Sequence, residues 1–200
     1  MARGVARGED GRTARSQRTR DQAVDALLAL LREGVANPTV AEVAERTGVT
    51  PRSIHANFTS IEALHRAAVD RATADVITRI RPIDVTAPLA ARIDALCHQR
   101  AVIHEHLAPL RRAARAREAT SPALAEARAT ALAAGRDQIR RVFAAELAPL
   151  GPAARRRAAA AVDAAAGDGA WELWRDGYGL SPAVARRTMA EAVGRLLDAS

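Results

Sequence analysis

Residues 39–57 bring together hydrogen-bonding side chains at the starts of two short helix-forming runs. Thr39 and Thr50 each stand directly before such a run, and the backbone N–H groups at a helix N-terminus suit a phosphate group. Arg52 lies in the first turn of the second run, and an arginine can read guanine through its O6 and N7 atoms. These residue types therefore predict contacts with double-stranded DNA. The side chains that we expect to point outward from the second run are Thr50, Arg52, Ser53, His55 and Asn57.

The same segment has the sequence pattern of two helices joined by a tight turn. The first helix is expected over Val40 to about Thr47, and the second over Pro51 to about Asn57. Between them, Gly48 can take the positive φ that a tight turn requires. Ala44 is small enough to let the second helix cross close by, and Ile54 attaches that helix to the core. This pattern is typical of a helix-turn-helix, whose second helix lies in the major groove while the first crosses the backbone.

An arginine-rich segment precedes this motif. Residues 1–20 contain six arginines and two acidic residues, and residues 1–15 carry almost no apolar side chains. High charge with low hydrophobicity is typical of disorder, so we expect residues 1–15 to form a disordered basic arm. Such an arm can bind the phosphate backbone of DNA, and we place Arg18 and Arg20 among the DNA-binding residues. The alternative is a solvated tail without a partner.

Four short runs in this region match a known pattern. They are Thr39–Ala44, Gly48–Thr50, Asn57–Phe58 and Ser60–Leu64. Together they resemble the N-terminal domain of TetR-family transcriptional regulators, over about residues 17–66. The resemblance implies a three-helix DNA-binding domain, followed by a larger helical domain that dimerises and usually holds an effector pocket.

Three positions depart from the family pattern. His55 stands where the recognition helix usually has a tyrosine, and Arg52 stands where a glycine is common. Ile61 replaces the lysine that usually opens the fourth helix and meets a phosphate. His55 can still donate a hydrogen bond, but Ile61 cannot. We therefore expect the arginine-rich arm to supply part of the affinity for the DNA backbone.

The composition predicts that helices position all of these residues. Alanine makes up 50 of the 200 residues and aromatic residues only 2%; alanine favours helices, whereas strands favour aromatic and β-branched residues. Proline, glycine and capping signals divide the chain into about nine helices without a strand. We expect an all-α fold with a helix-turn-helix DNA-binding domain over residues 16–62 and a helical effector-binding and dimerisation domain over residues 63–200.

Charge and residue spacing exclude several classes of protein. The net charge is +7 with a pI near 11.2, which permits a polyanionic partner. No apolar run is long enough for a membrane span and no secretory signal is present, so we expect a cytoplasmic protein. His98, His104 and His106 lack the spacing of a metal site, and no nucleophile or paired acid and base is found. We therefore expect neither an enzyme, nor a metal site, nor a cofactor.

Two groups of residues in the second domain are candidates for binding. Trp171 and Trp174 lie one turn apart and suit either the wall of an effector pocket or a core or dimer interface. We place Arg100 and His104 with them as effector-binding candidates. The helices over residues 153–174 and 182–197 are candidates for a four-helix dimer interface, as in the TetR family. Its expected contact residues are Val162, Gly167, Val193, Leu196 and Leu197.

These observations lead to one main hypothesis and one alternative. The main hypothesis is a homodimeric TetR-like regulator, a repressor that an unidentified small-molecule effector releases from a palindromic operator. The alternative is a helical ligand-binding or interaction protein whose degenerate helix-turn-helix has little affinity for DNA.

Overall fold

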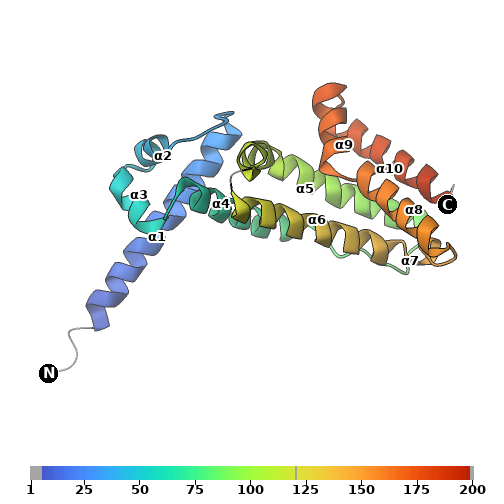
Figure 1. Cartoon of the computed structure of the whole chain (residues 1–200), viewed down its shortest axis with the longest axis horizontal. Helices are drawn as coiled ribbons and strands as arrows, with labels where there is room; N and C mark the ends of the chain where they lie inside the picture. The colour runs from blue at the N-terminus through green and yellow to red at the C-terminus, as the bar shows by residue number, and fades with distance from the viewer. Residues whose placement is uncertain (1–5, 120, 199–200) are drawn as a thin grey trace. The chain divides into compact units, whose positions relative to one another are not determined.

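The computed structural model describes residues 6–119 and 121–198, and this part of the chain is helical without a strand (Figure 1). This confirms the all-α fold. The elements are α1 (Ala6–Arg32), α2 (Val40–Thr47), α3 (Pro51–Asn57), α4 (Ile61–Ile77), α5 (Leu89–Glu118), α6 (Pro122–Val142), α7 (Ala144–Leu147), α8 (Pro152–Ala165), α9 (Asp168–Glu172), the short π-helix η1 (Leu173–Gly177) and α10 (Pro182–Asp198).

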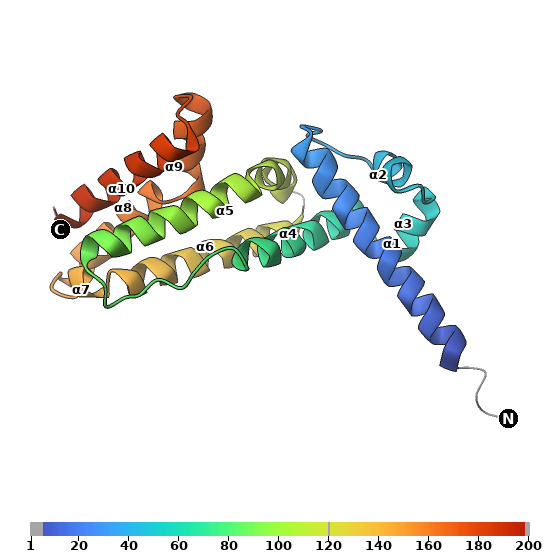
Figure 2. The same cartoon turned by 180° about the vertical axis from the view of Figure 1, so that it is seen from behind.

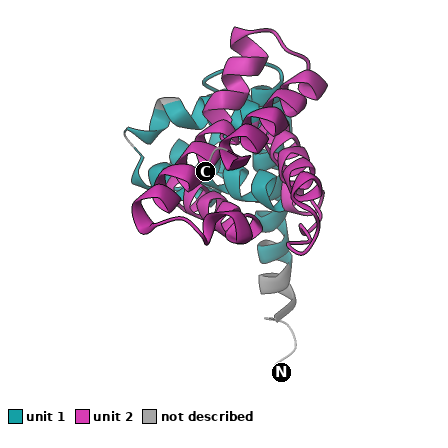
Figure 3. Cartoon of the chain, turned by 90° about the vertical axis from the view of Figure 1, so that its right-hand side faces the viewer, with its two compact units in different colours: residues 1–74, 108–127 teal, residues 75–107, 128–200 magenta. Residues whose placement is uncertain are grey.

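The chain forms two compact units (Figure 3). The first comprises residues 1–74 and 108–127, and the second comprises residues 75–107 and 128–200. The first unit thus includes residues 63–74 and 108–127, which the sequence analysis placed in the second domain. Helices α4, α5 and α6 each contribute to both units, so no linker of loop residues marks the division.

The first unit is built on α1, which packs against both α2 and α3. Leu27 of α1, Val43 of α2 and Ile54 of α3 are each at most 1% exposed. A fully buried side chain of this size stabilises the fold by about 1.5–3 kcal/mol. Gly48 ends α2 in the left-handed conformation with φ 70°, as the turn between the two helices requires.

Helix α1 begins earlier than the sequence pattern indicated. Residues 1–15 were expected to be a disordered arm, but the helix already starts at Ala6; residues 1–5 lie outside the described part of the chain. The segment combines alanine, arginine and glutamate, which favour helices, with only two glycines, each costing about 1 kcal/mol. The basic residues of this segment therefore extend from the domain on a helix.

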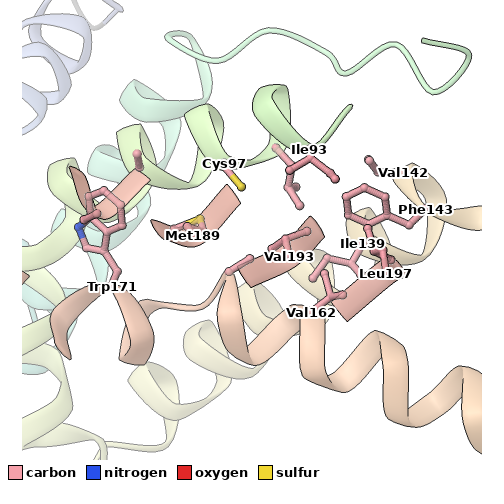
Figure 4. Close-up of a cluster of buried hydrophobic side chains, with 14 of the residues drawn as sticks. Ile93, Cys97, Ile139, Val142, Phe143, Val162, Trp171, Met189, Val193 and Leu197 are labelled. Atoms are coloured by element: carbon pink, nitrogen blue, oxygen red, sulfur yellow. The ribbon is translucent and has the colours of Figure 1, made fainter. Parts of the chain in front are cut away.

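The second unit has a single apolar core to which α5, α6, α8 and α10 all contribute (Figure 4). Trp171 lies at one end of this cluster and Phe143 at the other, and both are at most 1% exposed. Helices α8 and α10 pack side by side. The helix expected over residues 153–174 is divided, because the chain leaves the helical conformation at Gly167, between α8 and α9. Helix α9 then continues directly into the π-helix η1.

A buried ion pair fixes the start of α5. An extended connection leads from α4 to α5, which begins beside α7 (Figure 2). Arg92 of α5 donates to both carboxylate oxygens of Glu146 at 2.5 and 2.8 Å and to the Val142 carbonyl at 2.6 Å. Paired charges of this kind hold a geometry firmly, because losing either partner strands the other in a desolvated site.

Candidate nucleic-acid interface

The N-terminus of α3 is capped by its own side chains. The Thr50 hydroxyl accepts from the Ser53 backbone N–H at 3.2 Å, and the two hydroxyls lie 3.0 Å apart. Pro51 occupies the first turn, where its missing N–H costs nothing. Both hydroxyls can still form hydrogen bonds with a ligand at this helix end. Because they are also hydrogen-bonded to each other, Thr50 and Ser53 would act together as one polar contact site rather than as two independent ones.

Two longer side chains of α3 point into solvent. Arg52 and His55 are exposed, and neither has a hydrogen-bond or ion-pair partner among the described residues. They are three residues apart and therefore lie on one face of the helix. Ile54 faces the opposite way and is 1% exposed. Helix α3 thus presents a cation and an imidazole outward while its apolar side anchors it.

The end of α3 is braced against α1. Arg20 donates to the Asn57 carbonyl at 2.7 Å, and its guanidinium lies 4.4 Å above the Phe58 ring. The Ser16 hydroxyl donates to Asn57 Oδ1 at 2.6 Å, and Asn57 Nδ2 donates to the Ser53 carbonyl at 2.8 Å. Arg20 and Asn57, which were expected to contact DNA, make these hydrogen bonds within the unit and so hold α3 in place. We call the group of Ser16, Arg20, Asn57 and Phe58 the α1–α3 brace.

Thr39 forms a complete capping box at the start of α2. Its hydroxyl accepts from the Glu42 N–H at 3.2 Å, while the Glu42 carboxylate accepts from the Thr39 N–H at 2.7 Å. These hydrogen bonds from Thr39 hold the pKa of Glu42 below its ordinary value. The carboxylate occupies the place that a phosphate would take at the Thr39 N–H. A phosphate at this helix end must therefore approach the N–H groups that follow Thr39.

The arginines of α1, α2 and α4 differ in whether they are paired with an acid. Arg18 is exposed and has no partner among the described residues. Arg46, by contrast, pairs with Glu33 at 2.5 Å, and Arg71 pairs with Asp21 and Asp25. Exposed pairs contribute at most about 1 kcal/mol each to stability. These pairs therefore connect α1 and the adjoining Glu33 to α2 and α4, but the apolar core contributes more to the stability of the unit. Ile61, the first residue of α4, is half-buried.

All four effector candidates belong to the second unit. His104 Nε2 lies 2.9 Å from the Ala166 carbonyl, and its ring centroid lies 5.9 Å from that of Trp171. Trp171 Nε1 donates to Glu105 at 3.0 Å. Arg100, one turn before His104 on α5, donates from Nη2 to the Gly135 carbonyl at 3.0 Å. Trp174 is half-buried against the same core.

Three of the five expected dimer residues are buried within the single chain. Val162 and Val193 are 0% exposed and Leu197 is 7% exposed within the single chain. These three side chains belong to the core of the second unit and have almost no surface left for a partner subunit. Gly167 and Leu196 are half-buried. The apolar spacing of α8 and α10 reflects packing within the chain. The exposed residues of α8 include the small Ala160 and Ala164 in its second half and Arg155, Arg156 and Arg157 nearer its start.

The other sequence candidates have ordinary environments. Among the described residues, no group of three or more histidine, cysteine, aspartate or glutamate side chains is placed to hold a metal ion. Cys97 is fully buried, and burial raises the pKa of its thiol to about 12, so it stays protonated and unreactive. None of the described helices is long and apolar enough to cross a membrane.

Comparison with known proteins agrees with the geometry of the first unit. The family model of bacterial regulatory proteins, tetR family, matches residues 24–68, which include the helix-turn-helix and the start of α4. This match identifies residues 24–68 as a TetR-type N-terminal domain. The matched segment is therefore the helix-turn-helix DNA-binding domain of a bacterial regulatory protein of this type. No curated protein matches the chain significantly.

Two solved structures share the fold of this chain over nearly its whole length. One is a transcriptional regulator of Rhodococcus sp. Rha1, with 22% identity, a TM-score of 0.69 and coverage of 90% of this chain and 96% of that one. The other is a protein of Mesorhizobium loti MAFF303099 named as a TetR-family transcriptional regulator, with 20% identity, a TM-score of 0.62 and coverage of 92% and 98%. At these identities the likeness concerns the fold.

Proposed function

We propose that the chain is a homodimeric TetR-family repressor that binds a palindromic operator and is released by a small-molecule effector. The observation that carries this proposal is the arrangement of α3. Its apolar side is fixed by Ile54 and the α1–α3 brace, while Arg52 and His55 point outward without partners among the described residues. A rigid short helix with free polar ends is what reading a major groove requires.

Each DNA-facing residue has a definite task in this proposal. Arg52 reads a guanine through O6 and N7, and His55 donates to a neighbouring base or phosphate. The Thr50 and Ser53 hydroxyls contact the phosphate at the mouth of the groove. Arg18 on α1 adds a sequence-independent contact with the backbone. In this scheme Asn57 and Arg20 act mainly by positioning α3, and Thr39 presents the start of α2.

A dimer supplies the second reading helix. We place its interface on the outward side of α8 and α10, where Ala160 and Ala164 allow another helix to approach closely. A two-fold axis then repeats one half-site as a palindrome. Simultaneous binding of both half-sites gives an affinity that one helix-turn-helix cannot reach.

Release requires an effector that prefers the protein geometry that does not fit the operator. The effector then shifts the population away from the DNA-binding form, by no more than its differential affinity for the two forms. We place its site in the second unit, beside Arg100, His104, Trp171 and Trp174. The regulator acts in the cytoplasm and has no enzymatic activity in this proposal.

The decisive experiment is selection of bound sequences from a random DNA pool by the purified full-length protein. We expect an enriched palindrome, with affinity that falls steeply as salt increases. Arg52→Ala is expected to enrich a consensus that has lost one defined base in each half-site. Enrichment of no sequence at low salt would overturn the proposal and favour the alternative, a ligand-binding protein with a degenerate helix-turn-helix.

A further inference from the structure

Helix α5 carries two desolvated arginines in opposite electrostatic environments. Arg92 and Arg100 are two turns apart on α5. Arg92 is 6% exposed and is neutralised by Glu146, whose hydrogen bonds raise the pKa of Arg92. Arg100 has no such carboxylate, and burial lowers its pKa. The same residue type on the same helix is therefore satisfied at one position and not at the other.

The guanidinium of Arg100 uses only one of its donors. Its Nη2 donates to the Gly135 carbonyl at 3.0 Å, whereas its buried Nε has no hydrogen-bond partner within the described residues. No ion pair to Arg100 is formed by any described carboxylate. Asp163 of α8 is close enough to favour the charged form, but it makes no direct contact. An arginine does not lose its proton in a protein, so this charge has no direct ion pair and is offset only from a distance by Asp163.

The surroundings of Arg100 are shaped to keep its guanidinium in this place. Gly135 lies against it: a Cβ at residue 135 would be 3.1 Å from Nη1. His104 follows one turn later on the same face of α5 and contacts Ala166 at the end of α8. Arg100 is half-buried, so part of the side chain remains within reach of a small molecule.

We propose that the effector is an organic monocarboxylate whose carboxylate pairs with the guanidinium of Arg100. This inference rests on the proposed function, because it names the chemical class of the effector at the site placed in the second unit. A planar guanidinium with unused donors matches a carboxylate in two parallel hydrogen bonds. The bound carboxylate would supply a counter-charge to Arg100, as Glu146 does to Arg92.

The charges around Arg100 favour a monoanion over a phosphate. Arg128, another basic residue of the unit, is paired with Asp168 at 3.3 Å. Asp163 adds a negative charge nearby, which disfavours a dianion.

The first test compares the two arginines in the protein without ligand. Arg92→Gln leaves Glu146 without its partner and is expected to lower the Tm by about 10 °C. Arg100→Gln removes an uncompensated charge and loses only one hydrogen bond to a carbonyl, so its Tm is expected to equal or exceed that of the parent. A fall in Tm as large as that of Arg92→Gln would show a structural arginine and would overturn the inference.

The second test measures binding by thermal shift with benzoate, phenylacetate and octanoate, each beside its uncharged amide at the same millimolar concentration. At least one carboxylate is expected to raise the Tm by several degrees while its amide does not. The shift is expected to vanish in Arg100→Gln and to persist in Arg141→Gln, which changes an exposed arginine of α6. Equal shifts with acid and amide, a shift that survives Arg100→Gln, or no shift with any of the acids would each overturn the inference.

The same carboxylates separate this inference from the proposed function. If the protein selects a palindrome but no carboxylate binds at Arg100, the inference fails and the regulator proposal stands. If a carboxylate binds at Arg100 but no DNA sequence is selected, the regulator proposal fails and the anion site stands.

Discussion

A buried histidine in the DNA-binding unit makes its stability depend on pH. His65 of α4 is 0% exposed, and neither ring nitrogen has a hydrogen-bond partner among the described residues. Burial, reinforced by the positive charge of Arg117, lowers the pKa of His65 from 6.5 to about 4. The unfolded chain therefore takes up a proton at a higher pH than the folded chain. The free energy of unfolding is expected to fall between pH 6.5 and 4, by up to about 3 kcal/mol.

Urea denaturation of His65→Leu at pH 7.5, 5.5 and 4.5 tests this prediction. Leucine removes two unpaired polar atoms without leaving a partner unsatisfied, so the variant is expected to match the parent at pH 7.5 and to exceed it at pH 4.5. His98→Gln, at an exposed position of α5, serves as the control and should retain the pH dependence of the parent. An unchanged pH dependence in His65→Leu would assign the acid sensitivity to other groups.

Arg52 is the residue expected to carry base specificity. Arg52→Ala is predicted to weaken binding to the selected operator by roughly 1–3 kcal/mol and to relax the preference at one base of each half-site. Titrations with operator and scrambled DNA provide the measurement. Arg46→Ala is the matched control, because Arg46 is paired with Glu33. An equal loss on both DNAs for Arg52→Ala would mean that Arg52 contacts only phosphate.

At the level of elements, two arginines on α1 distinguish positioning from direct contact. Arg20 belongs to the α1–α3 brace, whereas Arg18 has no partner among the described residues. Arg20→Ala is predicted to lower the free energy of unfolding by about 1–3 kcal/mol. Arg18→Ala should leave stability unchanged but reduce the slope of log affinity against log salt by about 1.

Denaturation and salt titration of both variants provide the measurements. If Arg20→Ala keeps full stability and loses one unit of salt slope, Arg20 is a phosphate ligand, as its position in the sequence first indicated. If Arg18→Ala keeps the salt slope of the parent, that part of α1 does not reach DNA.

The elements show where sequence reasoning succeeds and where it stops. The caps at Thr39 and Thr50 and the turn at Gly48 were predictable because each depends on residues within four positions. Pro109 lies inside α5, which continues through it to Glu118, although a proline in a sequence usually marks the end or a kink of a helix. A proline removes one hydrogen bond from a helix, a cost that packing over a long helix can offset.

At the level of the whole molecule, contacts between distant residues were not predictable. The pairs Arg71–Asp21 and Arg92–Glu146 join residues 50 and 54 positions apart. A single sequence with many arginines offers numerous equivalent partners for each acid. Val162, Val193 and Leu197 illustrate the same difficulty: helical spacing identifies an apolar face but does not say whether it meets the core or a second subunit. Whether Arg100 has an ion-pair partner likewise depends on residues distant in the sequence, which no local pattern encodes.

The dimer prediction belongs to this largest scale and must avoid the core. Leu196 packs against the core of the second unit, so replacing it would confuse unfolding with dissociation. Ala160 is exposed on α8, and an exposed substitution that touches nothing changes stability by less than about 0.5 kcal/mol. In a two-fold interface each Ala160→Arg side chain acts twice. We therefore expect this variant to remain folded, to become a monomer and to lose operator affinity.

Analytical ultracentrifugation at micromolar concentration, with circular dichroism to verify folding, tests the dimer. The parent is expected to sediment at twice the chain mass of 21.2 kDa and Ala160→Arg at the single mass. Ala133→Arg, at an exposed position of α6, is the control and should remain dimeric. Operator titration of the same samples links assembly to function, because a monomer loses the gain in affinity from binding both half-sites at once. A parent that is monomeric yet binds the palindrome tightly would contradict the dimeric mechanism, and a dimeric Ala160→Arg would move the interface away from α8.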